Sequence, residues 1–354
     1  MTRVLLLFGG RSSEHEISCL SARSVLEVID RSRYEVVPVG ITPDGRWTLT
    51  DGPADPPGGR LPRVADDGPT VALVGTREGP RLLQIDEDGG FATTVLGPVD
   101  AAFPLLHGPW GEDGTVQGLL ATVGVPYVGA DVTASSIGID KAAMKATFAA
   151  RGLPQGAYLA VHRARWEQDP DGVVDELSVT LPAPWFTKPS RQGSSIGIRK
   201  VTLLDDLAEA MHEAYSYDDV VVIEQGVDGA REIEVGVLGS DRIEVTRPGE
   251  IVPSGEFYDF EAKYLADSQL VIPADVPAVV ADRVDQLARR AYRAIGCRGL
   301  ARIDFFLRPD GEVLLNEINT IPGFTPSSMF PRLWAAEGVD YPALVDRLLA
   351  DAAL

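Results

Sequence analysis

The sequence predicts an α/β protein that begins with a doubly wound parallel sheet and continues as α+β in its C-terminal half. Its 354 residues exceed one ordinary core and indicate two or three domains. Residues 4–8 (VLLLF) form the apolar run of a buried parallel strand. A glycine-serine loop and an amphipathic segment follow, which is how a doubly wound sheet opens. Near the C-terminus, β-rich runs at 303–307 and 313–318 flank a Pro-Asp-Gly turn and predict a hairpin.

The remaining elements follow from apolar periodicity. Strands are expected at 34–41, 99–106, 126–128, 185–189, 220–224 and 231–238. Helices are expected at 115–123, 141–151, 205–215, 277–295, 329–337 and 341–350. Residues 42–98 are predicted to be loop-rich, and residues 163–176 to be acidic and exposed. In the strand at 231–238, alternation places Glu232 and Glu234 on the outward face.

Composition excludes several classes of protein. A net charge of −20 argues against nucleic acid or an anionic membrane as a partner. No apolar run approaches the roughly 20 residues of a membrane span, and the run at 4–8 is too short for a signal peptide. Cys19 and Cys297 are the only cysteines, which is typical of a reduced, cytoplasmic protein without disulfides.

The C-terminal hairpin carries a candidate metal site. If its loop holds two or four residues, Arg302 lies opposite Glu317, Asp304 is the diagonal neighbour of Glu317, and Asn319 shares their face. Oxygen ligands of this kind suit Mg²⁺, which also takes phosphate oxygens. The alternative is a solvated strand face. The clustering at one end of an apolar hairpin, beside an arginine, favours a metal–phosphate site.

Lysine is rare in this chain, which makes each one informative. Of 32 basic residues only five are lysine: Lys141, Lys145, Lys188, Lys200 and Lys263. A compact ammonium is suited to a place beside phosphate, although chance is the alternative. We expect Lys145 and Lys200 to be ordinary surface residues.

A glycine- and serine-rich loop at 189–197 (PSRQGSSIG), here called the serine loop, follows Lys188 directly. Such a loop can fold over phosphates with its backbone N–H groups and hydroxyls. It lacks the Gly-Lys-Ser/Thr ending of a P-loop, and a plain turn is the alternative. The lysine-bearing strand before it favours a phosphate lid.

Two polar residues lie near the predicted crevice of the first sheet. Residues 13–16 fit a capping box, which places Glu14 in the first helical turn. There it either complements the helix dipole or offers a carboxylate to an ammonium group. His107 ends a strand where open α/β sheets bind ligands, and a structural histidine is the equal alternative. The aromatic, charged segment at 254–264 is predicted to cover an active site. The full dinucleotide fingerprint is missing, which disfavours an oxidoreductase.

Five motifs in series resemble the ATP-grasp fold and, within it, the D-alanine–D-alanine ligase family. They are residues 9–18 (GGRSSEHEIS), 107–118 (HGPWGEDGTVQG), 187–197 (TKPSRQGSSIG), 257–264 (FYDFEAKY), and the hairpin from 302 through 329. Each alone is weak, but five in order across nearly the whole chain are specific. The resemblance implies an N-terminal domain at 1–140, a central ATP-grasp subdomain at 141–228 and a C-terminal one at 229–354.

The resemblance also implies a nucleotide site. Three lysines would neutralise the ATP phosphates: Lys141, Lys188 and Lys263. The rest of the nucleotide would be contacted by Glu224, Gln225, Val227, Glu232 and Phe257. Gln225 stands where many relatives carry a lysine. Two Mg²⁺ ions, replaceable by Mn²⁺, would be held by Asp304, Glu317 and Asn319.

For the amino-acid substrates, the resemblance implies that one D-alanine is phosphorylated to an acyl phosphate and a second attacks it, for peptidoglycan precursor synthesis. The groups around the first D-alanine would be Glu14, His107, Ser194 and Tyr264. The groups around the second and the reacting carbonyl would be Arg302, Gly323, Ser328 and Met329. Tyr264 predicts a dipeptide rather than an ester product, and a homodimer is expected.

Two other functions stay open from the residues alone. Another ATP-grasp carboxylate–amine ligase would carry a similar hairpin and similar lysines, including one that makes D-alanine–D-lactate. A non-catalytic nucleotide-binding regulator would not require the complete set of Arg302, Asp304, Glu317 and Asn319.

Overall fold

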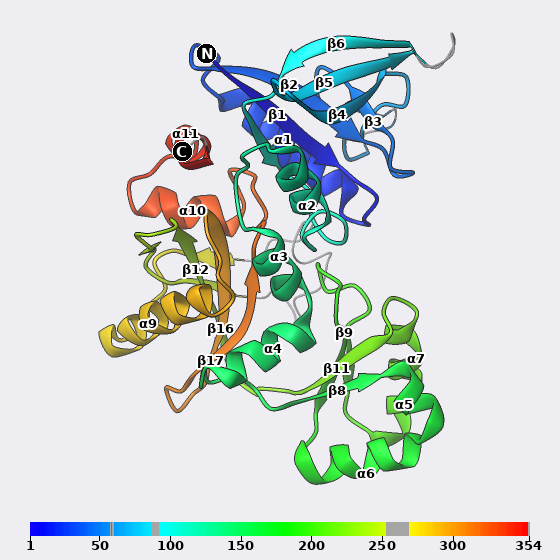
Figure 1. Cartoon of the computed structure of the whole chain (residues 1–354). Coiled ribbons are helices and arrows are strands. Elements are labelled where there is room, and N and C mark those ends of the chain that lie inside the picture. Colours follow the sequence, from blue (N-terminus) through cyan, green and yellow to red (C-terminus); the bar gives the residue numbers. More distant parts are fainter. Residues whose placement is uncertain (57, 59, 87–91, 253–268, 353–354) are drawn as a thin grey trace.

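The computed structural model describes residues 1–354 except 57, 59, 87–91, 253–268 and 353–354. Three sheets, with their helices, make up the protein (Figure 1). Phe257, Lys263 and Tyr264 lie outside the described residues. Within the part of the chain that is described, no helix is both long and apolar enough to cross a membrane.

The first sheet has seven strands in the order β6-β5-β4-β3-β2-β1-β7. Its parallel centre is β1 (Thr2–Gly9), β2 (Tyr34–Ile41) and β7 (Ala101–Pro104). The helices that follow these strands are α1 (His15–Val28), α2 (Thr115–Val123) and α3 (Val132–Ile139). The predicted strand–loop–helix opening is therefore confirmed.

The prediction that residues 42–98 are loop-rich is wrong. They form an antiparallel extension of the first sheet: β3 (Trp47–Leu49), β4 (Thr70–Thr76), β5 (Gly79–Asp86) and β6 (Ala92–Pro98). Only one face of this extension is well covered, and β6 lies at the sheet edge. The strands therefore lack the continuous apolar runs that mark fully buried strands.

The second sheet is antiparallel, in the order β10-β9-β11-β8. Its strands are β8 (Tyr158–His162), β9 (Trp185–Pro189), β10 (Arg199–Val201) and β11 (Val220–Gln225). One face is covered by α5 (Arg163–Gln168), α6 (Pro170–Thr180) and α7 (Leu207–Tyr215), which follows the short helix η1 (Leu204–Asp206). The serine loop connects β9 to β10, so it leaves the sheet at the end of the strand that carries Lys188.

The third sheet follows the order β15-β14-β12-β16-β17, with β13 (Glu244–Val245) paired to β12. Its strands are β12 (Arg231–Leu238), β14 (Gly249–Val252), β15 (Gln269–Val271), β16 (Leu300–Leu307) and β17 (Val313–Asn319). Two helices bury their apolar faces in its core, α4 (Lys141–Ala150) and α9 (Ala278–Ala294). Phe148 of α4 and Tyr292 of α9 pack there with Phe305 of β16.

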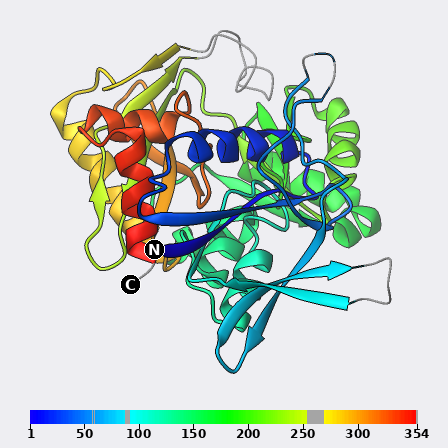
Figure 2. The same ribbon diagram turned by 90° about the horizontal axis from the view of Figure 1, so that it is seen from above.

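Of the last two helices, the first packs against β12 of the third sheet and the second returns to α1 and β7 of the first sheet. They are α10 (Met329–Ala336) and α11 (Tyr341–Ala352). Leu344 and Leu348 of α11 share a core with Val4, Leu6 and Phe8 of β1, so both ends of the chain build one hydrophobic cluster. Figure 2 shows red α11 beside the blue N-terminal strand. The division at 1–140, 141–228 and 229–354 stays a prediction.

The hairpin of β16 and β17 is confirmed, but its predicted register is wrong. Its loop has five residues, Arg308 to Glu312, and is closed by hydrogen bonds from Arg308 N to Glu312 O (2.9 Å) and from Gly311 N to Arg308 O (2.9 Å). A β-bulge then leaves Asn316 as an extra residue. Asp304 consequently lies directly opposite Glu317 instead of diagonal to it, and Arg302 lies opposite Asn319.

The shared face of these four side chains survives the change of register. The odd loop shifts the pairing by one residue and the bulge shifts it by one more, so the two shifts together restore the alternation of faces. The bulge also brings the two carboxylates closer than a diagonal pairing would, because directly opposite side chains are the nearest neighbours across strands.

Candidate active site

The carboxylate of Glu14 lies where three of the sequence motifs meet. Ser194 Oγ of the serine loop donates a hydrogen bond to it. A Cβ at Gly108 or Gly193 would lie 2.6 or 2.8 Å from Glu14 Oε2, so only glycine lets both loops approach this closely. Glu14 is buried, and Ser194 has a positive φ of 48°, which non-glycine residues rarely adopt.

The capping box predicted at 13–16 is wrong. Helix α1 begins at His15, its N-cap is Glu14, and no side chain caps it. Ser12 supports the turn instead, because its hydroxyl accepts from Glu14 N (3.2 Å) and donates to His107 O (2.6 Å). The Glu14 side chain is therefore left available for the crevice.

His107 joins the first sheet to the loop after β17. Its Nδ1 lies 3.1 Å from Ile321 O and 3.5 Å from Glu112 Oε1, and its Nε2 lies 3.2 Å from Ser21 Oγ. Burial alone would lower the pKa of His107, but the carboxylates of Glu112 and Glu14 outweigh it and raise the pKa. The buried ring thus connects α1 to the loop after β17, and it lies near Glu14.

A buried cluster of two lysines and a glutamate lies at the end of the second sheet. Glu224 Oε1 is 3.2 Å from Lys145 Nζ, and Glu224 Oε2 is 2.9 Å from Lys188 Nζ. Burial opposes ionisation of Glu224, but the two ammonium groups lower its pKa to about 2. Burial likewise lowers the pKa of Lys145.

The expectation that Lys145 is a surface residue is wrong, since it is 1% exposed, whereas Lys200 is exposed as predicted. Lys145 follows Lys141 by four residues in α4, and this spacing places both on one face of the helix. This spacing could have predicted that Lys145 lies on the same side of the helix as Lys141.

Lys188 of β9 lies near the hairpin, and Lys141 of α4 contacts the serine loop. Burial alone would lower the pKa of Lys188, but Glu224 and also Glu317 raise it, which shows that the hairpin carboxylate lies within electrostatic reach. Lys141 Nζ donates to Gln192 O of the serine loop (2.6 Å). Lys188 therefore lies near the hairpin, and the placement of Lys141 against the hairpin stays a prediction.

The hairpin side chains form one polar network. Arg302 donates to both oxygens of Asp304, with Nε 2.8 Å from Oδ1 and Nη2 2.7 Å from Oδ2. Asn319 Nδ2 donates to Asp304 Oδ2 (3.0 Å), and Glu317 is the direct cross-strand partner of Asp304. Among the described residues, no three His, Cys, Asp or Glu side chains converge as a metal site.

Glu234 belongs to this network: it lies on the face predicted by alternation, but it is buried there. It is 5% exposed, and its Oε2 lies 2.9 Å from Arg302 Nε. Burial opposes the charge of Arg302, but Asp304 and Glu234 raise the pKa of Arg302 well above its usual range. Alternation identified the face that Glu234 shares with Glu232, but it did not show that Arg302 and Asp304 of the neighbouring strand β16 lie on that face beside Glu234.

The residues after the hairpin form a tight turn into α10. Thr325 N donates to Ser328 Oγ (3.2 Å), and the two hydroxyls of Thr325 and Ser328 lie 2.8 Å apart. A Cβ at Gly323 would lie 3.2 Å from Ser328 Oγ. Ser328 is the N-cap of α10 but does not cap it with its side chain, and Met329 is buried.

The predicted adenine and ribose residues lie at the link between the second and third sheets. Gln225 ends β11, and its N–H donates to Ala157 O (3.0 Å). Val227 lies in the connection to β12, and Glu232 is the second residue of that strand, opposite Phe306. Glu232 also raises the pKa of Lys188, so it lies near that lysine.

Comparison with known proteins agrees with this geometry. Residues 3–130 match the family described as D-ala D-ala ligase N-terminus, and residues 147–350 match the one described as D-ala D-ala ligase C-terminus. The chain is 48% identical to the D-alanine–D-alanine ligase of Streptomyces coelicolor, with 98% of this chain and 92% of the relative aligned. It is 49% identical to that of Kineococcus radiotolerans, with 98% and 95% aligned.

Solved structures extend the comparison to three dimensions. The VanG D-Ala:D-Ser ligase from Enterococcus faecalis has a TM-score of 0.84 and 31% identity, with 99% of each chain covered. The D-alanine–D-alanine ligase from Coxiella burnetii has a TM-score of 0.81 and 30% identity, covering 100% of this chain and 95% of its own.

Proposed function

We propose below which residues carry the reaction of this chain, which belongs to the D-alanine–D-alanine ligase family. Its members use ATP to join two D-alanines, which is a step of peptidoglycan synthesis. The observation that carries the assignment is the convergence at Glu14. We propose that the Glu14 carboxylate, which Ser194, Gly108 and Gly193 approach closely, binds the amino group of a substrate, and that Lys141 beside the serine loop binds phosphate.

The ATP phosphates are proposed to lie between the lysines and the hairpin. Lys141 and Lys188 are held close to this space by Gln192 O and Glu224. Gln225, Val227 and Glu232 line the link that would receive the adenine and ribose, together with Glu224. Phe257 and Lys263 are proposed to add contacts from the segment outside the described residues.

The hairpin side chains fit a divalent metal, because they already bind the positively charged guanidinium group of Arg302. Asp304 directs both oxygens at the Arg302 guanidinium, and Glu317 stands opposite with Asn319 alongside. This oxygen-donor set suits Mg²⁺, with Mn²⁺ as a substitute. Two bound ions would neutralise phosphate charge as Lewis acids. Arg302 must give up at least part of its contact with Asp304, and Glu234 offers it a second anchor.

In the first step, the carboxylate oxygen of one D-alanine attacks the γ-phosphorus of ATP, the bridging P–O bond to the β-phosphate breaks, and ADP leaves. We propose that Glu14 holds the ammonium of this D-alanine, oriented by Ser194 and, from outside the described residues, Tyr264. His107 supports the same pocket through its contacts with Ile321 and Ser21.

In the second step, the free amine of the other D-alanine attacks the acyl carbon, the C–O bond to phosphate breaks, and the amine loses a proton. Arg302 and the Gly323 N–H are proposed to stabilise the oxygen that becomes negative, and Ser328 and Met329 to receive the second carboxylate. Loss of one such donor typically costs about 10²–10³ in rate.

Phosphate release with ATP, Mg²⁺ and D-alanine tests these roles. We expect release that depends on D-alanine and falls at least 100-fold in Arg302→Ala. Arg308→Ala is the matched control, because Arg308 lies at the exposed hairpin turn and pairs with Glu312 there. Equal loss in both variants, or unchanged release in Arg302→Ala, would remove Arg302 from the mechanism.

The choice of second substrate needs its own measurement, since one structural relative is a D-Ala:D-Ser ligase. We propose D-alanyl-D-alanine as the main product, because the relatives at 48–49% identity are D-alanine–D-alanine ligases and Tyr264 does not repel an ammonium-bearing nucleophile. Mass spectrometry of products from equal D-alanine, D-serine and D-lactate decides this. Dominant D-alanyl-D-serine or ester would refute the proposal.

We also propose that the enzyme acts in the cytoplasm as a homodimer. The use of ATP and of small amino acids supports the first proposal, and the family supports the second. Light scattering coupled to gel filtration measures the mass directly; a monomer at all concentrations would exclude the dimer.

A further inference from the structure

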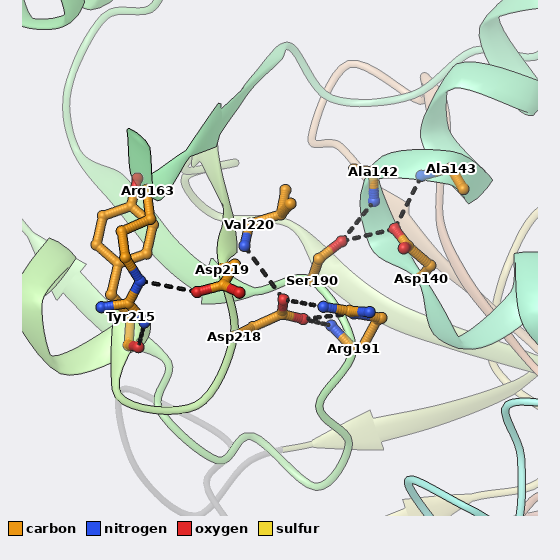
Figure 3. Close-up of polar contacts among 10 residues, drawn as sticks. All are labelled: Asp140, Ala142, Ala143, Arg163, Ser190, Arg191, Tyr215, Asp218, Asp219 and Val220. Atoms are coloured by element: carbon orange, nitrogen blue, oxygen red, sulfur yellow. Dashed lines mark hydrogen bonds and ion pairs between the residues drawn. The ribbon is translucent and has the colours of Figure 1, made fainter. Parts of the chain in front are cut away.

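The stem of the serine loop is held by an aspartate that the reaction does not use. Asp218 lies just before β11 and is 6% exposed. It accepts three hydrogen bonds from Arg191, from the backbone N (2.8 Å), Nε (3.0 Å) and Nη2 (2.6 Å). It also accepts one from Val220 N (3.1 Å). Figure 3 shows Asp218 between the loop stem and β11.

The preceding loop residue is fixed from the opposite side. Ser190 Oγ donates to Asp140 Oδ1 (2.7 Å) and accepts from Ala142 N (3.0 Å) (Figure 3). Ser190 O accepts from Lys141 N (2.9 Å). Ser190 N donates to Val220 O (2.9 Å). The stem is therefore bound to α4 through Ser190 and to β11 through Arg191.

The far end of the loop rests on the residue beside Asp218. Gly197 has φ +69°, and a Cβ there would lie 2.6 Å from Cδ2 of Tyr217 and 2.9 Å from Cγ of Pro189. The consecutive residues Tyr217 and Asp218 thus contact both ends of the serine loop. Such a support is needed because Ser194 and Ser195, at φ 48° and 60°, adopt a backbone conformation that the surroundings must impose.

We propose that Asp218 is a positioning residue for the ligase reaction, which holds the serine loop so that Ser194 reaches Glu14 and the loop N–H groups face the ATP phosphates. This inference rests on the proposed placement of the phosphates beneath the loop. Asp218 touches no substrate and acts through Arg191. The four hydrogen bonds to Asp218 fix the stem of the loop. Residues 192–197 beyond the stem are only half-buried.

The neighbouring residue provides a matched control. Asp219 also pairs with an arginine, with its Oδ1 2.8 Å from Arg163 Nε, and Arg163 donates to Tyr215 O (Figure 3). The Asp219 side chain is 64% exposed, and Arg163 lies at the start of α5, away from the serine loop. Asp218→Asn and Asp219→Asn therefore remove one charge and weaken one ion pair at the same turn.

Kinetics and proteolysis on the complete protein test the inference. We expect Asp218→Asn to raise the KM for ATP about tenfold or more, with a smaller change in kcat, and to speed tryptic cleavage after Arg191 by a similar factor. Asp219→Asn should change neither by more than about twofold. The thermal midpoint separates these effects from general destabilisation, because both variants should unfold within a few degrees of the parent.

Each result decides a separate point. If both variants behave alike in ATP KM and in cleavage after Arg191, the inference is overturned. Faster cleavage with an unchanged KM also overturns it, because the loop would be released without consequence for ATP. Dipeptide synthesis by the unaltered protein is measured alongside and decides the proposed function independently.

A second variant covers the possibility that Asp218→Asn does not fold. Arg191→Lys keeps the charge and the backbone bonds to Asp218 but loses the two-pronged guanidinium contact. We expect its KM for ATP to rise severalfold, between the parent and Asp218→Asn. An unchanged KM in Arg191→Lys would count against the anchor.

Discussion

Glu224→Gln replaces the anion of the buried lysine cluster with a neutral side chain of the same shape. In the parent, Glu224 is 7% exposed and contacts Lys145 and Lys188 at 3.2 and 2.9 Å. The glutamine keeps one acceptor oxygen but leaves two ammonium groups facing each other with no carboxylate between them. We therefore expect a large loss of stability rather than the small loss of a surface pair.

The magnitude follows from the pKa of Glu224. It is about 2, against 4.5 for an ordinary glutamate, because the two lysines outweigh the cost of burial. At about 1.4 kcal/mol per pKa unit, this difference corresponds to roughly 3 kcal/mol at neutral pH. Breaking a buried ion pair by removing one partner typically costs about 3–5 kcal/mol. Both routes predict a loss of roughly 3–5 kcal/mol.

Urea unfolding of the parent and of four variants, which are Glu224→Gln, Glu176→Gln, Lys145→Met and Lys145→Met/Glu224→Gln, measures this loss. The matched control is Glu176→Gln, which breaks the exposed pair with Arg165 and should cost under about 1 kcal/mol. The double variant Lys145→Met/Glu224→Gln should recover about 1 kcal/mol or more of the loss, since it removes one of the two opposed cations.

Two results would refute this reasoning. One is a loss in Glu224→Gln no larger than that in Glu176→Gln, which would mean that the cluster is not buried and tight. The other is strict additivity, in which the double variant loses as much unfolding free energy as the two single variants together. Additivity would mean that the two lysines do not repel each other when Glu224 is replaced.

Three further predictions follow from the same cleft. Because the folded pKa of Glu224 lies below its unfolded value of about 4.5, its stabilisation is complete above that pH and is lost as the pH falls toward 2; the difference in unfolding free energy between parent and Glu224→Gln should shrink over this range. Glu234→Gln removes the second carboxylate that holds Arg302, so Arg302 should stay paired with Asp304 and compete with the metal. We expect Mn²⁺ affinity, measured by calorimetry with ADP, to fall about tenfold, and an unchanged affinity would contradict this. Lys145→Met should raise the KM for ATP severalfold while Lys200→Met, an exposed lysine, leaves it unchanged, and equal effects would show that burial at Glu224 does not matter for the nucleotide.

The hairpin shows what a sequence predicts well and what it does not. Alternation along β16 and β17 identified the shared face of Arg302, Asp304, Glu317 and Asn319 correctly. The register was not predictable because an odd loop and a bulge both move it by one residue, and neither has a distinct signal in a Pro-Asp-Gly turn. The face survived only because the two shifts compensate.

Buried charges were the main omission. Lys145, Glu234 and Asp218 look like surface residues in the sequence, since charged side chains are seldom buried without a partner. Their partners Glu224, Arg302 and Arg191 come from other strands or loops, so only the fold reveals the pairs. Lys145 alone left a local clue, in its helical spacing from Lys141.

The edge of the first sheet was missed for a different reason. Strands β3–β6 are half-exposed and rich in threonine and glycine, so their periodicity is weak. The parallel centre was found because both of its faces are covered and its strands are continuously apolar. Motifs near strand ends pointed to Glu14, His107 and Lys188 as candidate site residues, because α/β sheets bind ligands at the carboxyl ends of their strands.

The central claim is that Asp304, Glu317 and Asn319 hold the metal against phosphates that Lys141 and Lys188 meet from the other side. Anomalous diffraction from a crystal grown with Mn²⁺ and ADP tests it most directly. We predict manganese peaks within about 2.5 Å of oxygens from all three hairpin side chains, with the diphosphate between them and the two lysines. Manganese bound elsewhere, or a diphosphate outside this cleft, would contradict the account.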